Sequence, residues 1–334
     1  MLGSRKTLPI LLIAACLGVR PIGTIGQIPS VVGETTIGSL DGEDGPIFGL
    51  VTRAVVDGEL LWVLDNLGPT GQLSVFSLTG EVIARTGARG EGPGEFGFPV
   101  ALAPSGEGIA VFDVANARIS TYLLRGNELG LNDEMRLPFA VSDACALSGR
   151  IFVLGFHEGL IHELDSGGSV VRSFGEPFLP DVPSVDFGRI LCRGPDALIV
   201  SSTHVPVVRR YTTDGAMLWE TEYEGFAPHR IEANAHGGRS FSGPPGGGHP
   251  DMMATLTSRA DRVVAVQYGP FTPGMRTTEA MTQLRTVLLD FETGVPVDET
   301  RDTPRIDVLA DTIAVAHPAL PYPRVVVYRI MSSN

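Results

Sequence analysis

Residues 60–65 read Leu-Leu-Trp-Val-Leu-Asp, and after a Gly/Pro turn residues 73–76 continue with Leu-Ser-Val-Phe. Residues 108–113 read Gly-Ile-Ala-Val-Phe-Asp, and after a short turn residues 118–123 continue with Arg-Ile-Ser-Thr-Tyr-Leu. Both stretches consist of an apolar run that ends in aspartate, a tight turn and a second apolar run. Such an internal repeat says more about the fold than any single residue, because each repeat is one supersecondary unit.

The repeat continues through the chain at a spacing of roughly 40–60 residues, and each unit has room for about four short strands. With 41 glycines and 25 prolines among 334 residues, turns are frequent. The chain has six such units, and a seventh unit would require that the long fifth unit be divided in two. In four units a glycine stands in the turn before the last strand, as a hairpin with positive φ requires. The units span 48–86, 98–137, 140–174, 186–223, 252–300 and 305–330, and the glycines are Gly80, Gly167, Gly215 and Gly294.

The last unit provides only three strands, whereas the segment Val31–Ile37 precedes the first unit and belongs to none. Pairing this segment with the last unit closes a ring and leaves only short, protected edges. The strands are apolar on both faces, as expected for sheets between neighbouring sheets. The sequence therefore predicts an all-β fold over residues 30–331. It is a six-bladed β-propeller of four-stranded antiparallel blades, closed by the N-terminal strand.

The stretch Gly90-Glu-Gly-Pro-Gly-Glu-Phe96, followed by Val111-Phe-Asp113 and Arg118-Ile119, resembles an NHL-type repeat. The chain is thus similar to bacterial six-bladed propellers of the NHL-repeat or TolB-like type. The match covers about residues 60–123, and beyond them only the strand pattern agrees. The resemblance implies an exported propeller, often a lipoprotein, and implies no single activity.

The N-terminus has the features of a targeting segment. Arg5 and Lys6 precede an apolar run over residues 8–15, which is too short to span a bilayer. Cys16 follows Ile-Ala-Ala, which resembles a bacterial lipobox. We therefore expect a signal peptide over 1–15, lipidation of Cys16 and a tether over 16–29. The protein would lie in the periplasm or on the outer membrane or cell surface. The alternative is an ordinary secretory signal that is cleaved nearby.

Charge and cysteine usage exclude several classes of function. A net charge of −13 without a basic cluster argues against nucleic-acid binding. The single lysine, Lys6, leaves the mature chain without a Schiff-base or Walker lysine. Cys145 and Cys192 fall in the first strands of consecutive units. We predict two buried free thiols, because neighbouring first strands need not bring their Cα atoms within about 7 Å, although an exported protein could form the disulfide.

Two segments between units have alternative interpretations. Gly92–Gly97 matches G-x-G-x-x-G, but a dinucleotide fingerprint must open a helix and here a strand follows. We interpret it as a connection in which Phe96 packs between blades and Glu95 and Arg89 order the turn. The insertion 229–250 contains His229, Glu232, His236 and His249, and their spacing matches no known ligand set. It is predicted as a surface loop, on the face of the second-to-third strand turns, that acts as a lid or partner contact.

The turn between the second and third strands carries a polar or titratable residue in every unit. These turns lie on one face of a propeller, around the mouth of a channel that the first strands line, and convergent polar groups at a concave mouth indicate a ligand site. Capping of the turn backbone is the alternative for the two aspartates. Ca²⁺ or Zn²⁺ could bind there, although no cofactor is expected. The candidate ligand-binding residues are Asp65, Asp113, His157, His204, Tyr268 and His317.

The chain has no G-x-S-x-G motif and no recognisable catalytic set. We therefore expect a monomeric binding or scaffold module that engages a protein, peptide or glycan through the loop-bearing face. Its contact with the membrane would be through the lipid anchor alone. The alternative is a metal-dependent hydrolase or lyase with its site at the channel mouth.

Overall fold

The computed structural model describes residues 31–330, with gaps at 69–71, 106–107, 156, 183–186, 234–238, 245–246, 260–262, 272–283, 304, 311 and 319–320. The predicted signal peptide, the tether and Cys16 lie outside these residues. All elements in the described part of the chain are β-strands. No helix within it is long and apolar enough to cross a membrane.

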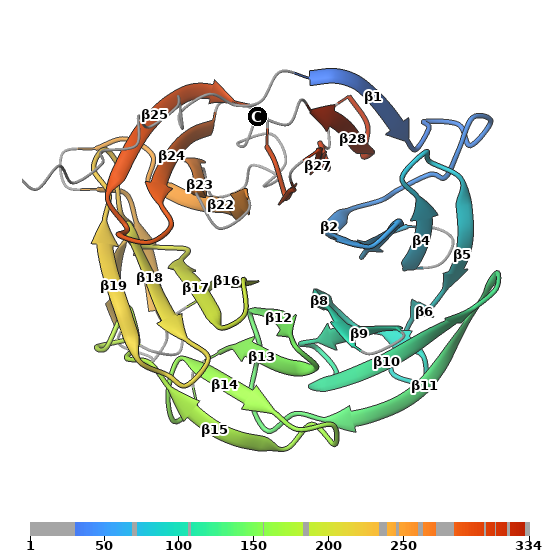
Figure 1. Ribbon diagram of the computed structural model, residues 1–334, viewed down its shortest axis with the longest axis horizontal. Coiled ribbons are helices and arrows are strands. Elements are labelled where there is room, and N and C mark those ends of the chain that lie inside the picture. Colours follow the sequence, from blue (N-terminus) through green and yellow to red (C-terminus); the bar gives the residue numbers. More distant parts are fainter. Residues whose placement is uncertain are drawn as a thin grey trace, which may run out of the picture.

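The strands form six four-stranded antiparallel sheets arranged as blades around a ring (Figure 1). This confirms the predicted six-bladed propeller, and the long fifth unit is one blade. Blades one to three are β2 (Val51–Asp57), β3 (Leu60–Asp65), β4 (Leu73–Ser77) and β5 (Val82–Thr86); β8 (Pro99–Ser105), β9 (Gly108–Asp113), β10 (Arg118–Arg125) and β11 (Glu128–Arg136); and β12 (Asp143–Leu147), β13 (Arg150–Leu154), β14 (Ile161–Leu164) and β15 (Val170–Phe174). Blades four to six are β16 (Gly188–Arg193), β17 (Ala197–Ser202), β18 (Val207–Thr212) and β19 (Met217–Glu222); β22 (Asp251–Arg259), β23 (Val263–Pro270), β24 (Leu284–Asp290) and β25 (Pro296–Thr303); and β26 (Val308–Leu309), β27 (Ile313–Ala316), β28 (Val325–Ile330) and β1 (Val31–Ile37).

The N-terminal strand closes the ring. β1 pairs antiparallel with β28, with Ile37 opposite Val325 and Thr35 opposite Val327. The buried Ile37 joins a cluster that includes Phe48 and Phe76 of blade one, so β1 also links the last blade to the first. The predicted closure is confirmed.

The core lies between adjacent blades. Every residue of β9 is buried, because this sheet is covered on both faces by its neighbours. Trp62 and Val75 of blade one pack with Ile109 and Tyr122 of blade two, and Phe96 from the connecting segment completes the same cluster. The predicted position of Phe96 is therefore confirmed. Two minor strands, β6 (Ala88–Arg89) and β7 (Glu95–Phe96), pair in this connection, and Glu95 accepts a hydrogen bond from the Gly92 amide.

Glycines in the hairpins before the outer strands adopt positive φ, as predicted. The angles are 93° at Gly80, 91° at Gly215 and 71° at Gly294. In blade three Gly168 takes this role, at 78°, one residue after the predicted Gly167. A side chain here would be strained, so the register of each outer strand depends on these glycines.

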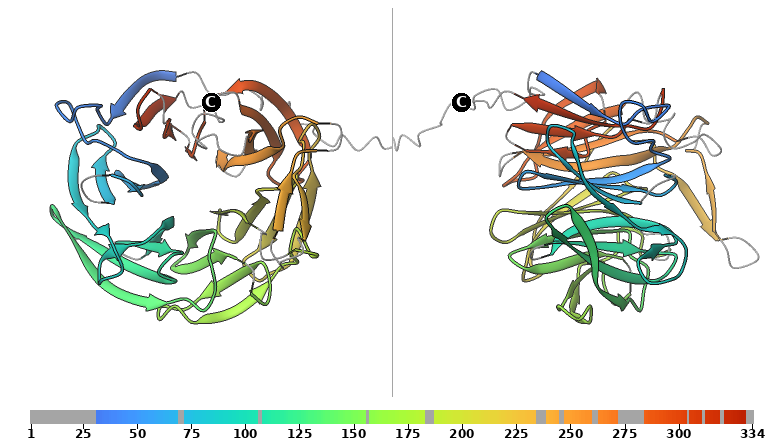
Figure 2. Two further views of the ribbon diagram at one scale, coloured as in Figure 1. Left: turned by 180° about the vertical axis from the view of Figure 1, so that it is seen from behind. Right: turned by 90° about the vertical axis from the view of Figure 1, so that its right-hand side faces the viewer.

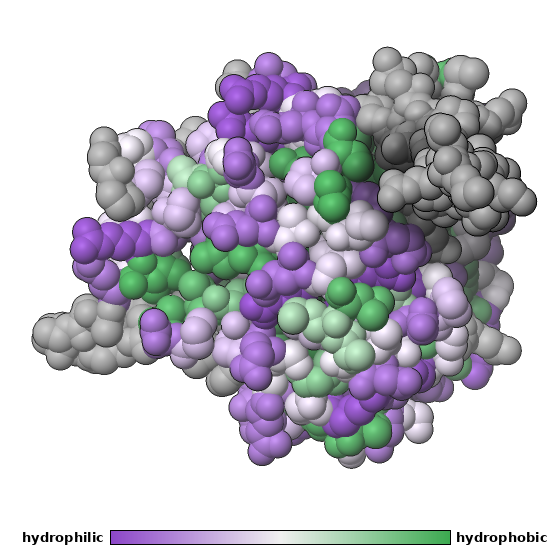
Figure 3. Space-filling model, turned by 60° about the vertical axis from the view of Figure 1, so that its left-hand side comes forward, coloured by the Kyte–Doolittle hydropathy of each residue, from purple (hydrophilic) through white to green (hydrophobic). Residues whose placement is uncertain are grey.

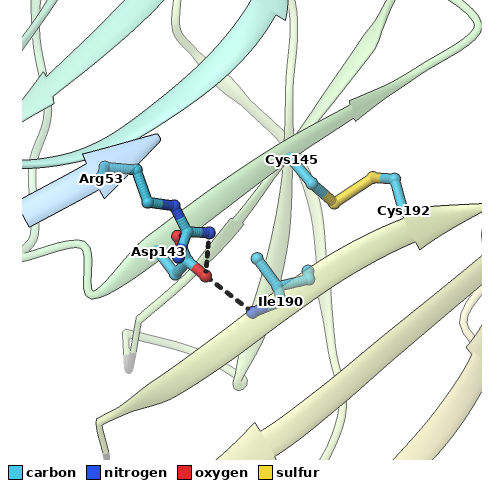
Figure 4. Close-up of a disulfide and its surroundings, with 5 residues drawn as sticks. All are labelled: Arg53, Asp143, Cys145, Ile190 and Cys192. Carbon is cyan, nitrogen blue, oxygen red and sulfur yellow. Dashed lines mark hydrogen bonds and ion pairs between the residues drawn. A yellow bond between two sulfur atoms is a disulfide. The ribbon is translucent and has the colours of Figure 1, made fainter. Parts of the chain in front are cut away.

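The prediction of two free thiols was wrong. Cys145 on β12 and Cys192 on β16 form a disulfide, with their Cα atoms 5.6 Å apart. β12 and β16 are the innermost strands of consecutive blades, and innermost strands converge on the ring axis. Figure 4 shows the sulfur–sulfur bond crossing from one strand to the other. The two cysteines are also only half-buried.

The insertion between blades four and five contains a hairpin, where a surface loop was predicted. β20 (Arg230–Ala233) pairs antiparallel with β21 (Arg239–Ser242). This hairpin projects from one side of the ring (Figure 2, right). His236, one of the residues considered as a ligand, lies outside the described residues.

Candidate functional site

A cavity of about 670 Å³ occupies the centre of the ring. Its wall is built from the first residues of the innermost strands and from second-to-third strand turns, so it opens on the loop-bearing face. All six blades contribute, and the lining is mostly apolar. Ligand pockets in proteins typically have this size and character. The lining residues include one from each blade or from the linker that enters it: Leu50, Pro99, Val141, Gly188, Met252 and Arg305.

The carboxylates of Asp65 and Asp113 accept hydrogen bonds from nearby backbone amides, and neither residue lines this cavity. Asp65 accepts hydrogen bonds from the amides of Gly49 (2.9 Å), Leu50 (2.6 Å) and Leu67 (3.3 Å). Gly49 has no room for a side chain, because a Cβ there would lie 2.2 Å from the Leu67 carbonyl oxygen. The carboxylate therefore fixes the linker that enters β2 as well as its own turn.

Asp113 repeats the arrangement one blade later. It accepts hydrogen bonds from the amides of Gly97 (2.7 Å) and Phe98 (2.8 Å) and from the side chain of Asn116 (2.8 Å). Both aspartates are buried. Their contacts are those of side chains that cap the turn backbone, which was the alternative role considered from the sequence. A role in ligand binding stays a prediction for both.

Two further predicted residues, His157 and Tyr268, belong to aromatic clusters away from the cavity wall. His157 is exposed and stacks on Phe139, with ring centroids 5.3 Å apart. The buried Tyr268 packs against Tyr223 and Phe226 and donates a hydrogen bond to the Glu224 carbonyl. The predicted ligand role of these side chains also remains untested.

His204 lies at the base of the β20–β21 hairpin. Its ring is 5.2 Å from that of His229 and 5.4 Å from that of Phe241. Burial, with a smaller effect of His229, lowers the pKa of His204 to about 4. The imidazole is therefore neutral at pH 7, and it helps to attach the hairpin to blade four.

His317 is the one of the six predicted residues that lines the cavity. Its Nε2 is 3.0 Å from Asp307, which also forms a 2.8 Å ion pair with Arg305. Burial lowers the pKa of His317, against the attraction of Asp307. Burial alone would raise the pKa of Asp307, but Arg305 and His317 outweigh it and hold that pKa below its usual range.

A second carboxylate, Asp143 on β12, lies behind the opposite part of the wall. Arg53 of β2 forms a 2.7 Å ion pair with it, and the Ile190 amide donates a 3.0 Å hydrogen bond to it (Figure 4). Asp143 is completely buried, so loss of Arg53 would leave this carboxylate without its hydrogen-bonded ion-pair partner. This contact ties blades one, three and four together around the axis.

Arg189 on β16 is the cation that faces the cavity from this side. Its Nη1 lies 4.0 Å from a carboxylate oxygen of Asp143, which is beyond hydrogen-bonding distance. Burial, together with the repulsion of Arg53, lowers the pKa of Arg189 to about 10. The guanidinium therefore remains protonated at pH 7.

Reasoning from the sequence missed Arg53, Asp143 and Arg189. The signal was present, because each is a charged residue inside an otherwise mostly apolar first strand, and first strands line the channel. Arg193, the last residue of β16, crosses the channel at the end away from the loop-bearing face. Its side chain donates hydrogen bonds to the carbonyls of Ser258 (2.6 Å) and Leu309 (2.9 Å).

The described lining residues offer a mostly apolar surface with the cationic side chains of Arg189 and Arg305. No group of three histidine, cysteine, aspartate or glutamate side chains that could hold a metal ion occurs among the described residues. The metal-dependent hydrolase or lyase considered from the sequence therefore gains no support from them. An apolar chamber with cationic side chains can bind a molecule that has an apolar part and an anionic part.

These features define a six-bladed propeller with a central cavity open on its loop-bearing face. Residues 40–168 match the family DUF5128, which is described as a 6-bladed beta-propeller. None of the curated proteins compared with the chain matches it.

Solved structures agree with this fold. An inferred exported protein of Bacteroides fragilis superimposes with a TM-score of 0.60 at 13% identity, covering 90% of this chain and 94% of its own. A DUF4221 family member of Bacteroides vulgatus gives 0.61 at 10% identity, with coverages of 92% and 98%. Virginiamycin B lyase of Staphylococcus aureus gives 0.51 at 12% identity, with coverages of 90% and 99%. At such identities the likeness concerns the fold alone.

Proposed function

We propose that the protein is an exported binding module that engages a protein, peptide or glycan through its loop-bearing face. The observation that carries this proposal is the cavity of about 670 Å³, to which all six blades contribute. A rigid ring around a mostly apolar chamber suits binding, because little ordering is required when the ligand enters.

Exposed apolar side chains around the mouth support the same function. Phe98 and Phe187 line the cavity, yet 49% and 45% of their surfaces are exposed. Phe241 of the projecting hairpin is also exposed. Its ring packs against His204, and His204 in turn packs against Phe187. Aromatic residues at a concave mouth are typical anchors of binding surfaces. On the side shown in Figure 3, apolar residues form small groups separated by polar ones.

Export and anchoring are part of the proposal. The lipobox-like sequence before Cys16 supports a lipid-anchored location in the periplasm or on the cell surface. The Cys145–Cys192 disulfide supports an oxidising compartment. We expect a monomer without a resident cofactor.

Panning of a random peptide library and a glycan array against the purified protein tests this function. The variant Phe98→Ser/Phe187→Ser alters the rim. The matched control Val82→Ser/Val171→Ser alters two similarly exposed residues on the outer strands β5 and β15. We expect binders of the wild type to lose at least tenfold in affinity for the rim variant and to retain it for the control. Binders affected only by the control, or no binder at all, would refute the proposal.

A further inference from the structure

The cavity wall carries positive charge and no carboxylate. Among its described lining residues, Arg189 and Arg305 are cationic, burial lowers the pKa of His317, and no aspartate or glutamate is present. Asp143 and Asp307 lie behind the wall. The arginines with which these two aspartates pair determine which arginine can bind a ligand.

Both carboxylates are already engaged by other groups. Asp307 pairs with Arg305 at 2.8 Å, and Asp143 pairs with Arg53 at 2.7 Å and accepts the Ile190 amide. Arg189 makes no hydrogen bond through its guanidinium to the described residues, and 22% of its side chain is exposed. Among the described residues beside the cavity, Arg53, Arg189 and Arg305 outnumber Asp143 and Asp307 by one, and Arg189 is the arginine of these three without a hydrogen-bonded carboxylate.

We propose, extending the binding function above, that Arg189 recognises the carboxylate of an amphipathic organic acid whose apolar part contacts Phe98, Phe187 and Met252. A guanidinium can bind a carboxylate through two parallel hydrogen bonds. One excess positive charge balances a monoanion, whereas a phosphate dianion would leave a negative charge in an apolar chamber. The cavity volume suits a ligand of drug-like or short-peptide size.

The acidic net charge does not prevent this recognition. The chain carries −13 overall, but at physiological ionic strength interactions between exposed charges decay over about 8 Å. Arg189 would contact the anion directly in a partly dry site, where screening is weak. The local positive charge therefore determines the preference.

Calorimetric titration with 4-phenylbutyrate and its neutral analogue 4-phenylbutanamide measures this preference. A short apolar peptide with a free or an amidated C-terminus forms the second arm and distinguishes a peptide from a small acid. We expect at least one carboxylate to bind tenfold or more tightly than its amide. In Arg189→Met this ratio falls to about one, while Arg189→Lys keeps part of it.

The control is Arg125→Met, which removes an exposed arginine at the end of β10 and should leave the ratio unchanged. Circular dichroism establishes that each variant is folded. If Arg189→Met does not fold, Arg189→Gln, which keeps a polar side chain without the charge, serves in its place, and the same loss of the ratio is expected. Equal affinities for acid and amide, or an unchanged ratio in Arg189→Met, would overturn the inference. Peptide or glycan binding that depends on Phe98 and Phe187 but not on a carboxylate would do the same, and it would leave the proposed function standing.

Discussion

Single side chains position the linkers between blades. Asp65 follows the last apolar position of β3, and its carboxylate reaches back across the chain to the linker before β2. Asp113 does the same one blade later. A carboxylate that accepts several backbone hydrogen bonds replaces the water that these amides lose on burial.

We expect Asp65→Ala to lower the free energy of unfolding by about 3 kcal/mol, because buried amide donors would lose their acceptor. Urea unfolding followed by tryptophan fluorescence measures this change, since Trp62 lies on the same strand. Asp290→Ala is the matched control. Asp290 caps a more exposed turn through Thr293, and its loss should cost less than about 1 kcal/mol. Equal costs for the two variants would contradict a special role of Asp65.

At the level of elements, the innermost strands were the least predictable. Strand positions follow from apolar runs and turn residues, and β3 and β4 begin and end where the sequence indicated. How closely two innermost strands approach depends on the radius of the ring, which no local pattern records. For this reason the Cys145–Cys192 disulfide was missed, and so was the ion pair between Arg53 and Asp143, which are 90 residues apart.

Removal of the disulfide should destabilise the protein substantially. The two cysteines are 47 residues apart, and closing a loop of that length stabilises the folded chain by about 4 kcal/mol in the chain-entropy view. We expect Cys145→Ser/Cys192→Ser to lower the free energy of unfolding by that amount, so that the midpoint of denaturant unfolding falls. Wild type measured with a reductant should behave like the variant. An unchanged midpoint in both would show that the bond contributes nothing to stability.

At the scale of the whole molecule, stability depends on closure of the ring. The last blade takes three strands from the C-terminal part and β1 from the N-terminal part. Without β1, β28 would become an exposed edge and Ile37 would leave the cluster it shares with blade one.

A chain that begins at residue 38 should therefore be less stable than one that begins at residue 31. Loss of the β1–β28 hydrogen bonds and of the buried Ile37 should cost at least about 4 kcal/mol. Thermal unfolding of the two truncated chains makes the comparison, and the longer one controls for removal of the N-terminal segment. Equal melting temperatures would show that β1 is not needed for closure.

Local information in the chain was enough to determine the blades. Apolar runs, turn glycines such as Gly80 and the unpaired segment 31–37 are short-range patterns, and they specified the strand order and the closing strand. Only the tertiary structure decided which side chains meet at the axis. Arg189 shares its surroundings with Arg53 and Asp143 because three blades converge there, and such contacts depend on ring geometry rather than on neighbours in sequence.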